Sequence, residues 1–255
     1  LEGSRPDVIV WVEYPGSVGR GVVTDIGSRF QAVKERVADA AGRAGRDPSD
    51  VTIVAVSKRF PAACVDAAVA AGVTDVGENR IQEAEPKIQE ARAQVRWRLV
   101  GSLQTNKARK AVALFDCIDS VDSARLLRRL DALSLEQNEK GDDPLEALLQ
   151  VNVTGEATKH GVSPENIGPL LDAAEECQAV QVTGLMTMAP LTQDESVVRR
   201  CFQETHALAR RIDTMGYAHV RMDDLSMGMT GDFEIAIEEG ATLVRLGTAI
   251  FGERP

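Results

Sequence analysis

The sequence has few of the residues that build metal sites, disulfide frameworks or nucleic-acid-binding surfaces. Among its 255 residues are only four cysteines and three histidines, and none has the CxxC or clustered spacing of metal ligands. We therefore predict no metal site and no disulfides, and we expect the cysteines to be buried small side chains in a reducing cytoplasm. The formal net charge of −10 argues against nucleic acid or an anionic membrane as partner.

The sequence also lacks a long apolar run and is poor in aromatic residues. No stretch approaches the roughly 18 to 20 apolar residues that cross a bilayer, and residues 1–24 have neither the basic start nor the long apolar segment of a signal peptide. We expect residues 1–24 to be an N-terminal extension or leader, with no conformation predicted. Aromatic residues make up 4% and hydrophobic residues 44% of the chain, so we expect a core built mainly from Val, Ile, Leu and Ala.

Helix-like and strand-like segments alternate from residue 25 onward. A charged amphipathic helix is predicted at 25–45, before a first strand at 51–58. Seven further strands, each separated from the next by a helical segment, are predicted at 75–79, 96–103, 117–121, 145–153, 180–188, 224–227 and 243–251. Such alternation predicts an α/β fold with a parallel sheet, and eight units indicate a single closed (β/α)8 TIM barrel over residues 25–255 with an extra N-terminal helix. An open doubly wound sheet is the alternative.

One lysine, Lys58, stands at the end of the first predicted strand, whose β-branched residues indicate burial. Partial desolvation there disfavours the charged ammonium, so more of the neutral amine should be available. A neutral amine can form a Schiff base with an aldehyde such as pyridoxal 5′-phosphate (PLP). The alternative is a lysine that extends along the surface into solvent.

The loops after the seventh and eighth predicted strands are rich in hydroxyl groups and glycine. In a barrel of this kind, these two loops commonly hold a phosphate group. Ser226 and Thr248 offer hydroxyls, while Gly228 and Gly247 let the backbone come close to an anion. Either glycine alone is typical of an ordinary turn, but their presence in both loops favours a phosphate site. No GxGxxG motif follows the first strand, which disfavours a dinucleotide site.

Two further residues at strand ends have two interpretations each. Arg245 lies within an apolar strand, so its charge needs a partner. That partner is either a carboxylate, Glu78 or Asp119, or the pyridine nitrogen of a cofactor, which an arginine would keep unprotonated. Asn79 could hydrogen-bond the substituents of a cofactor ring or cap the following helix.

The residues at the predicted strand ends together closely resemble the pyridoxal phosphate homeostasis protein family. The matching segments are 55–58, 77–79, 100–107, 184–187, 225–230 and 244–252, and the likeness runs in unbroken order over roughly residues 25–254. This family is similar to the N-terminal barrel domain of alanine racemase. The resemblance implies that Lys58 is the Schiff-base lysine, Asn79 a cofactor contact and Arg245 the neighbour of the pyridine nitrogen, with the phosphate held by Ser226, Gly228, Gly247 and Thr248.

The resemblance also implies a function. Members buffer PLP and deliver it to apo PLP-dependent enzymes, with effects on amino-acid and keto-acid balance. Alanine racemases add a second domain and a tyrosine as second acid/base; this sequence ends at Pro255, and its only tyrosines, Tyr14 and Tyr217, match no such motif. Because racemisation by two bases needs a group on each face of the substrate, we expect no robust catalysis, no catalytic residues and a monomer. A weak amino-acid racemase or lyase is the alternative, and a barrel that binds a protein partner without PLP is a third.

Overall fold

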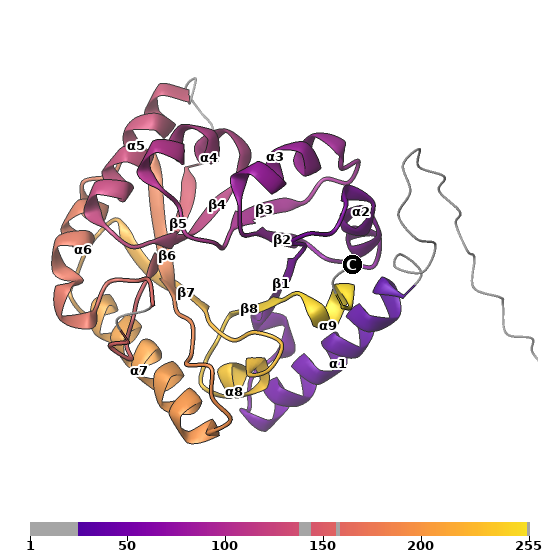
Figure 1. Ribbon diagram of the computed structural model, residues 1–255. Coiled ribbons are helices and arrows are strands. Elements are labelled where there is room, and N and C mark those ends of the chain that lie inside the picture. Colours follow the sequence, from indigo (N-terminus) through magenta and orange to yellow (C-terminus); the bar gives the residue numbers. More distant parts are fainter. Residues whose placement is uncertain (1–24, 138–143, 157–158, 254–255) are drawn as a thin grey trace, which may run out of the picture.

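Eight parallel strands form a closed barrel in the computed structural model, which describes residues 25–137, 144–156 and 159–253. Each strand is paired with the next along the chain, and β8 closes the barrel against β1. Helices surround the strands on the outside, as the ribbon coloured by sequence shows (Figure 1). The predicted (β/α)8 barrel is therefore confirmed, and the open doubly wound sheet is wrong.

The strands are short, and most end earlier than the sequence predicted. They are β1 (Thr52–Val56), β2 (Asp75–Glu78), β3 (Arg96–Leu99), β4 (Cys117–Val121), β5 (Leu145–Gln150), β6 (Val180–Met186), β7 (Val220–Ser226) and β8 (Leu243–Leu246). The residues between the predicted and the observed ends, such as 100–103 after β3, form loops at the C-terminal rim of the barrel. Apolar content alone could not mark these ends, because rim loops of a barrel are themselves partly buried.

The segment 243–251 was the largest error in the predicted strands. Only Leu243–Leu246 is strand, because the chain turns at Gly247 and continues as helix α9 (Thr248–Phe251). A short apolar run is compatible with a buried strand and with a buried helix, so periodicity could not separate the two.

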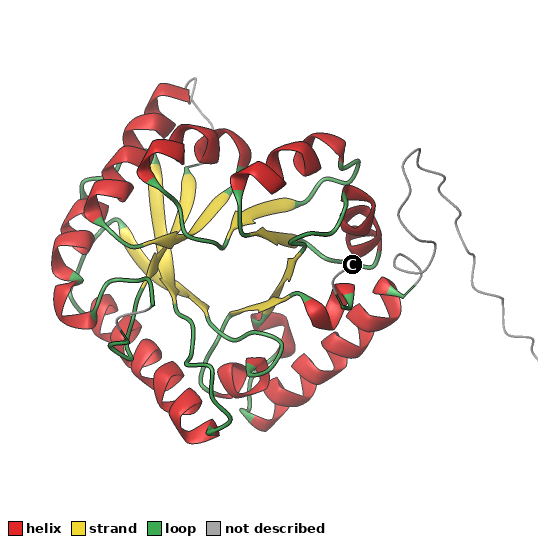
Figure 2. Ribbon diagram, viewed as in Figure 1, coloured by secondary structure: helices red, strands yellow, loops and turns green. Residues whose placement is uncertain are grey.

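The remaining helices cover the barrel as the alternation of the sequence predicted (Figure 2). They are α1 (Ile26–Arg43), α2 (Ala62–Ala70), α3 (Ile81–Glu90), α4 (Ala108–Leu114), α5 (Ala124–Gln137), α6 (Gly168–Glu175), α7 (Glu195–Asp213) and α8 (Phe233–Glu238). The extra N-terminal helix, α1, buries Ile26, Phe30, Val33 and Val37, whose spacing places them on one helical face. That face packs on α2, α8 and α9, and so covers the seam where β8 meets β1.

A charged cluster fills part of the barrel interior. Arg98 of β3 donates from Nε to Asp119 of β4 over 3.1 Å, and its Nη1 lies 3.3 Å from an oxygen of Asp75 in β2. All three side chains are buried, so each charge has a partner of opposite sign close by. Asp119 is consequently engaged by Arg98 and does not form an ion pair with Arg245.

The four cysteines are free thiols, and all four are buried, as predicted. None of the helices within the described parts of the chain combines the length and apolar character needed to span a membrane. The predicted extension 1–24 lies outside the described residues.

Candidate functional site

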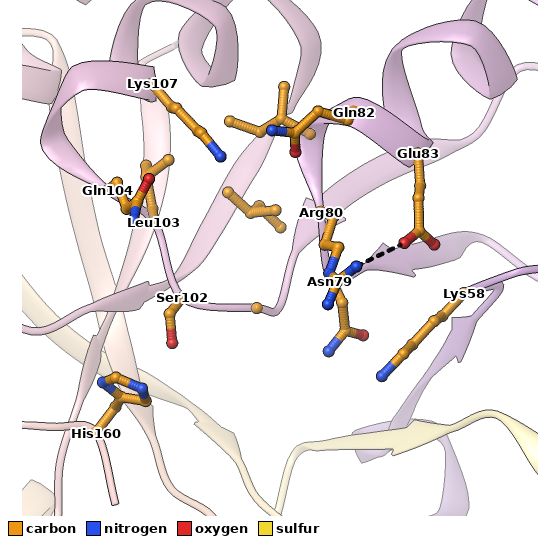
Figure 3. Close-up of a pocket in the computed structure, with 13 residues that line it drawn as sticks. Lys58, Asn79, Arg80, Gln82, Glu83, Ser102, Leu103, Gln104, Lys107 and His160 are labelled. Carbon is orange, nitrogen blue, oxygen red and sulfur yellow. Dashed lines mark ion pairs between the residues drawn. The ribbon is translucent and has the colours of Figure 1, made fainter.

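Lys58 lies in the tight turn that follows β1, and its half-buried amine points into a cavity at the C-terminal rim of the barrel (Figure 3). The next residue, Arg59, has a φ of 67°, a left-handed conformation that side chains other than glycine seldom adopt. The turn closes where the Phe60 N–H donates to the carbonyl oxygen of Ser57 over 2.9 Å. Phe60 stacks on Phe251 of α9 with ring centroids 5.2 Å apart, which joins this turn to the end of the chain that follows β8.

A buried polar cluster lies beneath the Lys58 turn. The Ser57 hydroxyl donates to Glu78 Oε1 over 2.6 Å, and Lys87 Nζ donates to the Ser57 carbonyl oxygen over 2.7 Å. Lys87 also forms an ion pair with Glu78 Oε1. Our sequence reasoning missed this cluster, and it placed Glu78 wrongly as a possible partner of Arg245. The spacing of Lys87 could have indicated a buried charge that needs a partner, because Lys87 shares the buried face of α3 with Ile81 and Ala84.

The cavity beside Lys58 has a volume of about 860 Å³ and a basic rim. It is lined by the end of β3, by the first turn of α3 and by residues that follow β1, β2, β3 and β5, namely Lys58, Asn79, Arg80, Ile81, Gln82, Glu83, Leu99, Gly101, Ser102, Leu103, Gln104, Lys107 and His160. Arg80 is 3.6 Å from Glu83, whereas Lys58 and Lys107 have no ion pair within the described part of the chain. A protein with a net charge of −10 thus presents two lysines without carboxylate partners at one opening.

Asn79 follows β2 and lines the same cavity, and Figure 3 shows its side chain beside that of Lys58. The N-cap residue of α3 is Arg80, and among the residues that the structure describes no side chain caps this helix by a hydrogen bond. The helix-capping interpretation of Asn79 is therefore wrong. Gly101 of the neighbouring loop packs directly on the Asn79 backbone, since a Cβ there would lie 2.2 Å from the Asn79 carbonyl oxygen.

Arg245 of β8 is buried, and within the described part of the chain its guanidinium hydrogen-bonds only neutral oxygens. Its Nη1 donates to Ser226 Oγ over 2.6 Å and its Nη2 donates to the Thr187 carbonyl oxygen over 2.7 Å. The predicted alternative of an ion pair with Glu78 or Asp119 is wrong, because these carboxylates pair with Lys87 and Arg98. Burial lowers the pKa of the Arg245 guanidinium, although an arginine remains protonated at any physiological pH.

β8 lies beside the strand that leads to Lys58, and the loop after β7 lies against β8, where the Arg245 N–H donates to the Gly228 carbonyl oxygen over 3.0 Å. In the register of β1 with β8, Val54 is opposite Arg245, and a Cβ on Gly247 would lie 3.3 Å from the Val56 carbonyl oxygen. Gly228 has a φ of +91°, and a Cβ there would lie 2.6 Å from the Cβ of Ala236 in α8. Ser226 is buried at the end of β7, while the exposed Thr248 begins α9.

The barrel therefore brings all seven predicted site residues to one rim, but it divides them into two groups. Lys58 and Asn79 face the cavity. The other five, Ser226, Gly228, Arg245, Gly247 and Thr248, are on the β7 and β8 side of Lys58 and do not line it. The carboxylate of Asp232 borders this second group, since its Oδ1 accepts from the Met229 N–H over 2.6 Å. Burial raises the pKa of the Asp232 carboxyl group.

The chain matches known proteins over most of its length. The protein family described as alanine racemase, N-terminal domain, matches residues 29–255. A pyridoxal phosphate homeostasis protein of Pseudomonas aeruginosa is 40% identical over 233 residues, which cover 91% of this chain and 97% of that protein. The protein of the same name from Escherichia coli K12 is 34% identical over 236 residues, covering 91% of this chain and 98% of its own.

The chain also resembles proteins of known structure. PipY of Synechococcus elongatus PCC7942, solved with PLP bound, is 37% identical with a TM-score of 0.77, over 89% of this chain and 100% of that one. An alanine racemase from Clostridium difficile 630 has a TM-score of 0.69 at 10% identity, over 89% of this chain and 57% of that one. The second likeness shows the fold alone.

Proposed function

This chain belongs to the pyridoxal phosphate homeostasis protein family, and from this premise we propose that it binds PLP, buffers its concentration and delivers it to apo PLP-dependent enzymes. The observation that supports this most strongly is the position of Lys58. Its amine faces a cavity at the rim of the barrel, and β1 pairs with β8, which leads into Gly247 and Thr248. We further propose that it acts as a monomer in the cytoplasm.

The side chains present fit this cofactor. The buried guanidinium of Arg245 hydrogen-bonds neutral oxygens among the described residues, and because an arginine keeps its proton, it would leave a pyridine nitrogen beside it unprotonated. Gly228 and Gly247 leave out side chains where a Cβ would meet Ala236 or the Val56 carbonyl oxygen. This packing favours glycine at both positions, and a glycine backbone can also come close to a phosphate.

Each residue then has a distinct part. When bound, PLP supplies an aldehyde that an amine can hold reversibly as a Schiff base. Lys58 offers that amine, and Asn79 offers an amide beside it for ring substituents. Arg245 holds its proton on the guanidinium and donates toward the ring nitrogen, which leaves the ring a weaker electron sink than a carboxylate partner would. Ser226 and Thr248 donate hydroxyl groups to the phosphate, next to the backbone of Gly228 and Gly247.

We also propose that the protein has no robust catalytic activity. A two-base racemisation needs a second acid or base opposite Lys58. Tyr217 stands just before β7, at the opposite end of the strands from Lys58, and its hydroxyl donates to Asp172 over 2.9 Å. Tyr14 lies outside the described residues. His160 favours the second candidate, a weak racemase, because it lines the same cavity as Lys58.

Absorbance spectroscopy of the purified protein loaded with PLP tests the binding proposal. We expect a Schiff-base band near the visible edge that is lost in Lys58→Ala. Lys107→Ala is the matched control, because Lys107 lines the same cavity, and it should keep the band. A band that persists in Lys58→Ala contradicts the assignment.

Two further measurements separate buffering, delivery and catalysis. PLP should reach a defined apo-enzyme faster from the loaded protein than it is released into free solution; equal rates would indicate buffering without directed delivery. Incubation with a panel of L-amino acids should give no chiral inversion above that of free PLP. Inversion that disappears in His160→Ala would favour the weak racemase instead.

A further inference from the structure

The cluster of Ser57, Glu78 and Lys87 joins the two strands that lead to the cavity side of the site. Ser57 directly precedes Lys58, and Glu78 directly precedes Asn79. The hydroxyl of Ser57 donates to Glu78 Oε1 over 2.6 Å, so the bond connects β1 and β2 where both strands end. The side chain of Lys87 reaches this point from α3.

The donors of Lys87 are all directed at these two residues. Its Nζ is 2.7 Å from the Ser57 carbonyl oxygen and 3.3 Å from the Ser57 hydroxyl, and it forms an ion pair with Glu78 Oε1. The Ser57 carbonyl oxygen also accepts from the Phe60 N–H over 2.9 Å. This oxygen, directly before Lys58 in the chain, is thus held by two donors.

Burial of the Glu78 and Lys87 charges carries a desolvation penalty, so this cluster is an inefficient way to gain stability alone. Ser57 and Glu78 are fully buried and Lys87 is 6% exposed, while Glu78 Oε2 has no hydrogen-bond partner among the described residues. Well-packed apolar residues commonly replace a buried ion pair without loss of stability. Arg59, within the same turn, has a φ of 67°, a conformation that its surroundings must impose. Directional bonds at Ser57 can impose such a turn, whereas apolar packing is not directional.

We propose that Ser57, Glu78 and Lys87 are positioning residues that aim the Lys58 amine, and with it Asn79, at the aldehyde of bound PLP. This inference rests on the proposed function. The cluster fixes the direction of the amine and leaves the phosphate loops after β7 and β8 unaffected. Its loss should therefore weaken covalent capture of the cofactor more than contacts to its ring and phosphate.

Two ligands separate these effects. PLP carries the aldehyde, whereas pyridoxine 5′-phosphate carries an alcohol in its place and reports on ring and phosphate contacts alone. We expect Ser57→Ala, which removes the donor to Glu78, to lower the affinity for PLP by about tenfold, the effect of one lost buried hydrogen bond. The affinity for pyridoxine 5′-phosphate should change by less than about twofold, a difference within that of a neutral surface substitution. The double variant Lys87→Met/Glu78→Gln removes the ion pair without leaving one charge behind and should act in the same direction.

Val76→Ala is the matched control. Val76 is fully buried in the same strand as Glu78, so its truncation loosens this layer without touching the polar bonds. The ratio of the affinity for PLP to the affinity for pyridoxine 5′-phosphate should stay at the wild-type value in this variant. An unchanged ratio in Ser57→Ala, or an equal change in Val76→Ala, overturns the inference.

The failure of this inference is distinct from that of the proposed function. If the wild-type protein captures PLP through Lys58 and the ratio does not change in the cluster variants, only the positioning role is wrong. If the wild-type protein shows no Lys58-dependent band, the proposed function fails first. Should the double variant not fold, the ratio in Ser57→Ala decides alone.

Discussion

Gly228→Ala gives a prediction whose size follows from the geometry of the loop after β7. Gly228 has a φ of +91°, and a Cβ there would lie 2.6 Å from the Cβ of Ala236 and 2.9 Å from the Cα of Phe233. Both neighbours belong to α8, so the added methyl group meets a packed helix and not a flexible side chain. Either the loop or the helix has to move.

The expected loss of stability has two parts. A left-handed backbone costs a residue other than glycine roughly 1 to 2 kcal/mol, and the extra methyl group in a packed region costs about 1 to 3 kcal/mol. Alanine also reduces the conformational freedom of the unfolded chain, which offsets roughly 0.4 to 1 kcal/mol of this loss. We therefore expect the free energy of unfolding to fall by about 1 to 5 kcal/mol, and Tm to fall by roughly 2 to 20 °C for a chain of this size.

Chemical and thermal denaturation of the free protein measure this loss, and titration with pyridoxine 5′-phosphate measures the effect on the proposed phosphate site. Because the loop must shift, we expect the affinity to fall by about tenfold, as for one weakened contact to a charged group. Gly231→Ala is the control in the same loop, since a Cβ at Gly231 would meet nothing within 4 Å. If Gly228→Ala is as stable as Gly231→Ala, Gly228 does not pack closely against α8.

Three further substitutions test other parts of the account. Arg245→Leu leaves the Ser226 hydroxyl without its charged donor, so we expect the affinity for PLP, measured by absorbance titration, to fall by about 10- to 100-fold; an unchanged affinity would exclude Arg245 from the site. Gly101→Ala places a Cβ 2.2 Å from the Asn79 carbonyl oxygen, and crystals of this variant should show Asn79 displaced; an unmoved Asn79 contradicts the contact. Burial raises the pKa of the Asp224 carboxyl group, so this group stays protonated to a higher pH in the folded protein than in the unfolded chain. The free energy of unfolding therefore falls as the pH rises from about 4 through the pKa of the folded state. Asp224→Asn should therefore stabilise the protein at pH 7 relative to wild type in urea denaturation, by a margin that narrows toward about pH 4; a margin constant with pH refutes the titration argument.

The fold could be predicted because its main determinants are local. Alternation of strand and helix patterns indicates parallel pairing, and the number of units indicates closure of the barrel. The ends of elements were less predictable, because they depend on tertiary contacts. Gly247 turns the chain into α9, where the apolar sequence is equally compatible with a continued strand.

The site was predictable to the extent that strand ends gather at one rim. Lys58, Asn79 and the residues after β7 and β8 could be placed there from their order in the chain alone. The partners of buried charges could not, because they depend on which way each side chain faces. Glu78 faces α3 and meets Lys87, not Arg245, and this follows only from the packing of a helix on the outside of the barrel.

Hydride reduction of the PLP-loaded protein, followed by peptide mapping with mass spectrometry, tests the central claim most directly. Borohydride makes a Schiff-base linkage permanent, so the modified lysine can be identified without reliance on affinity or colour. We expect one adduct, on the peptide that contains Lys58, and no adduct on that peptide in Lys58→Ala. An adduct on Lys107 or any other lysine in place of Lys58, or no adduct at all, would contradict the account.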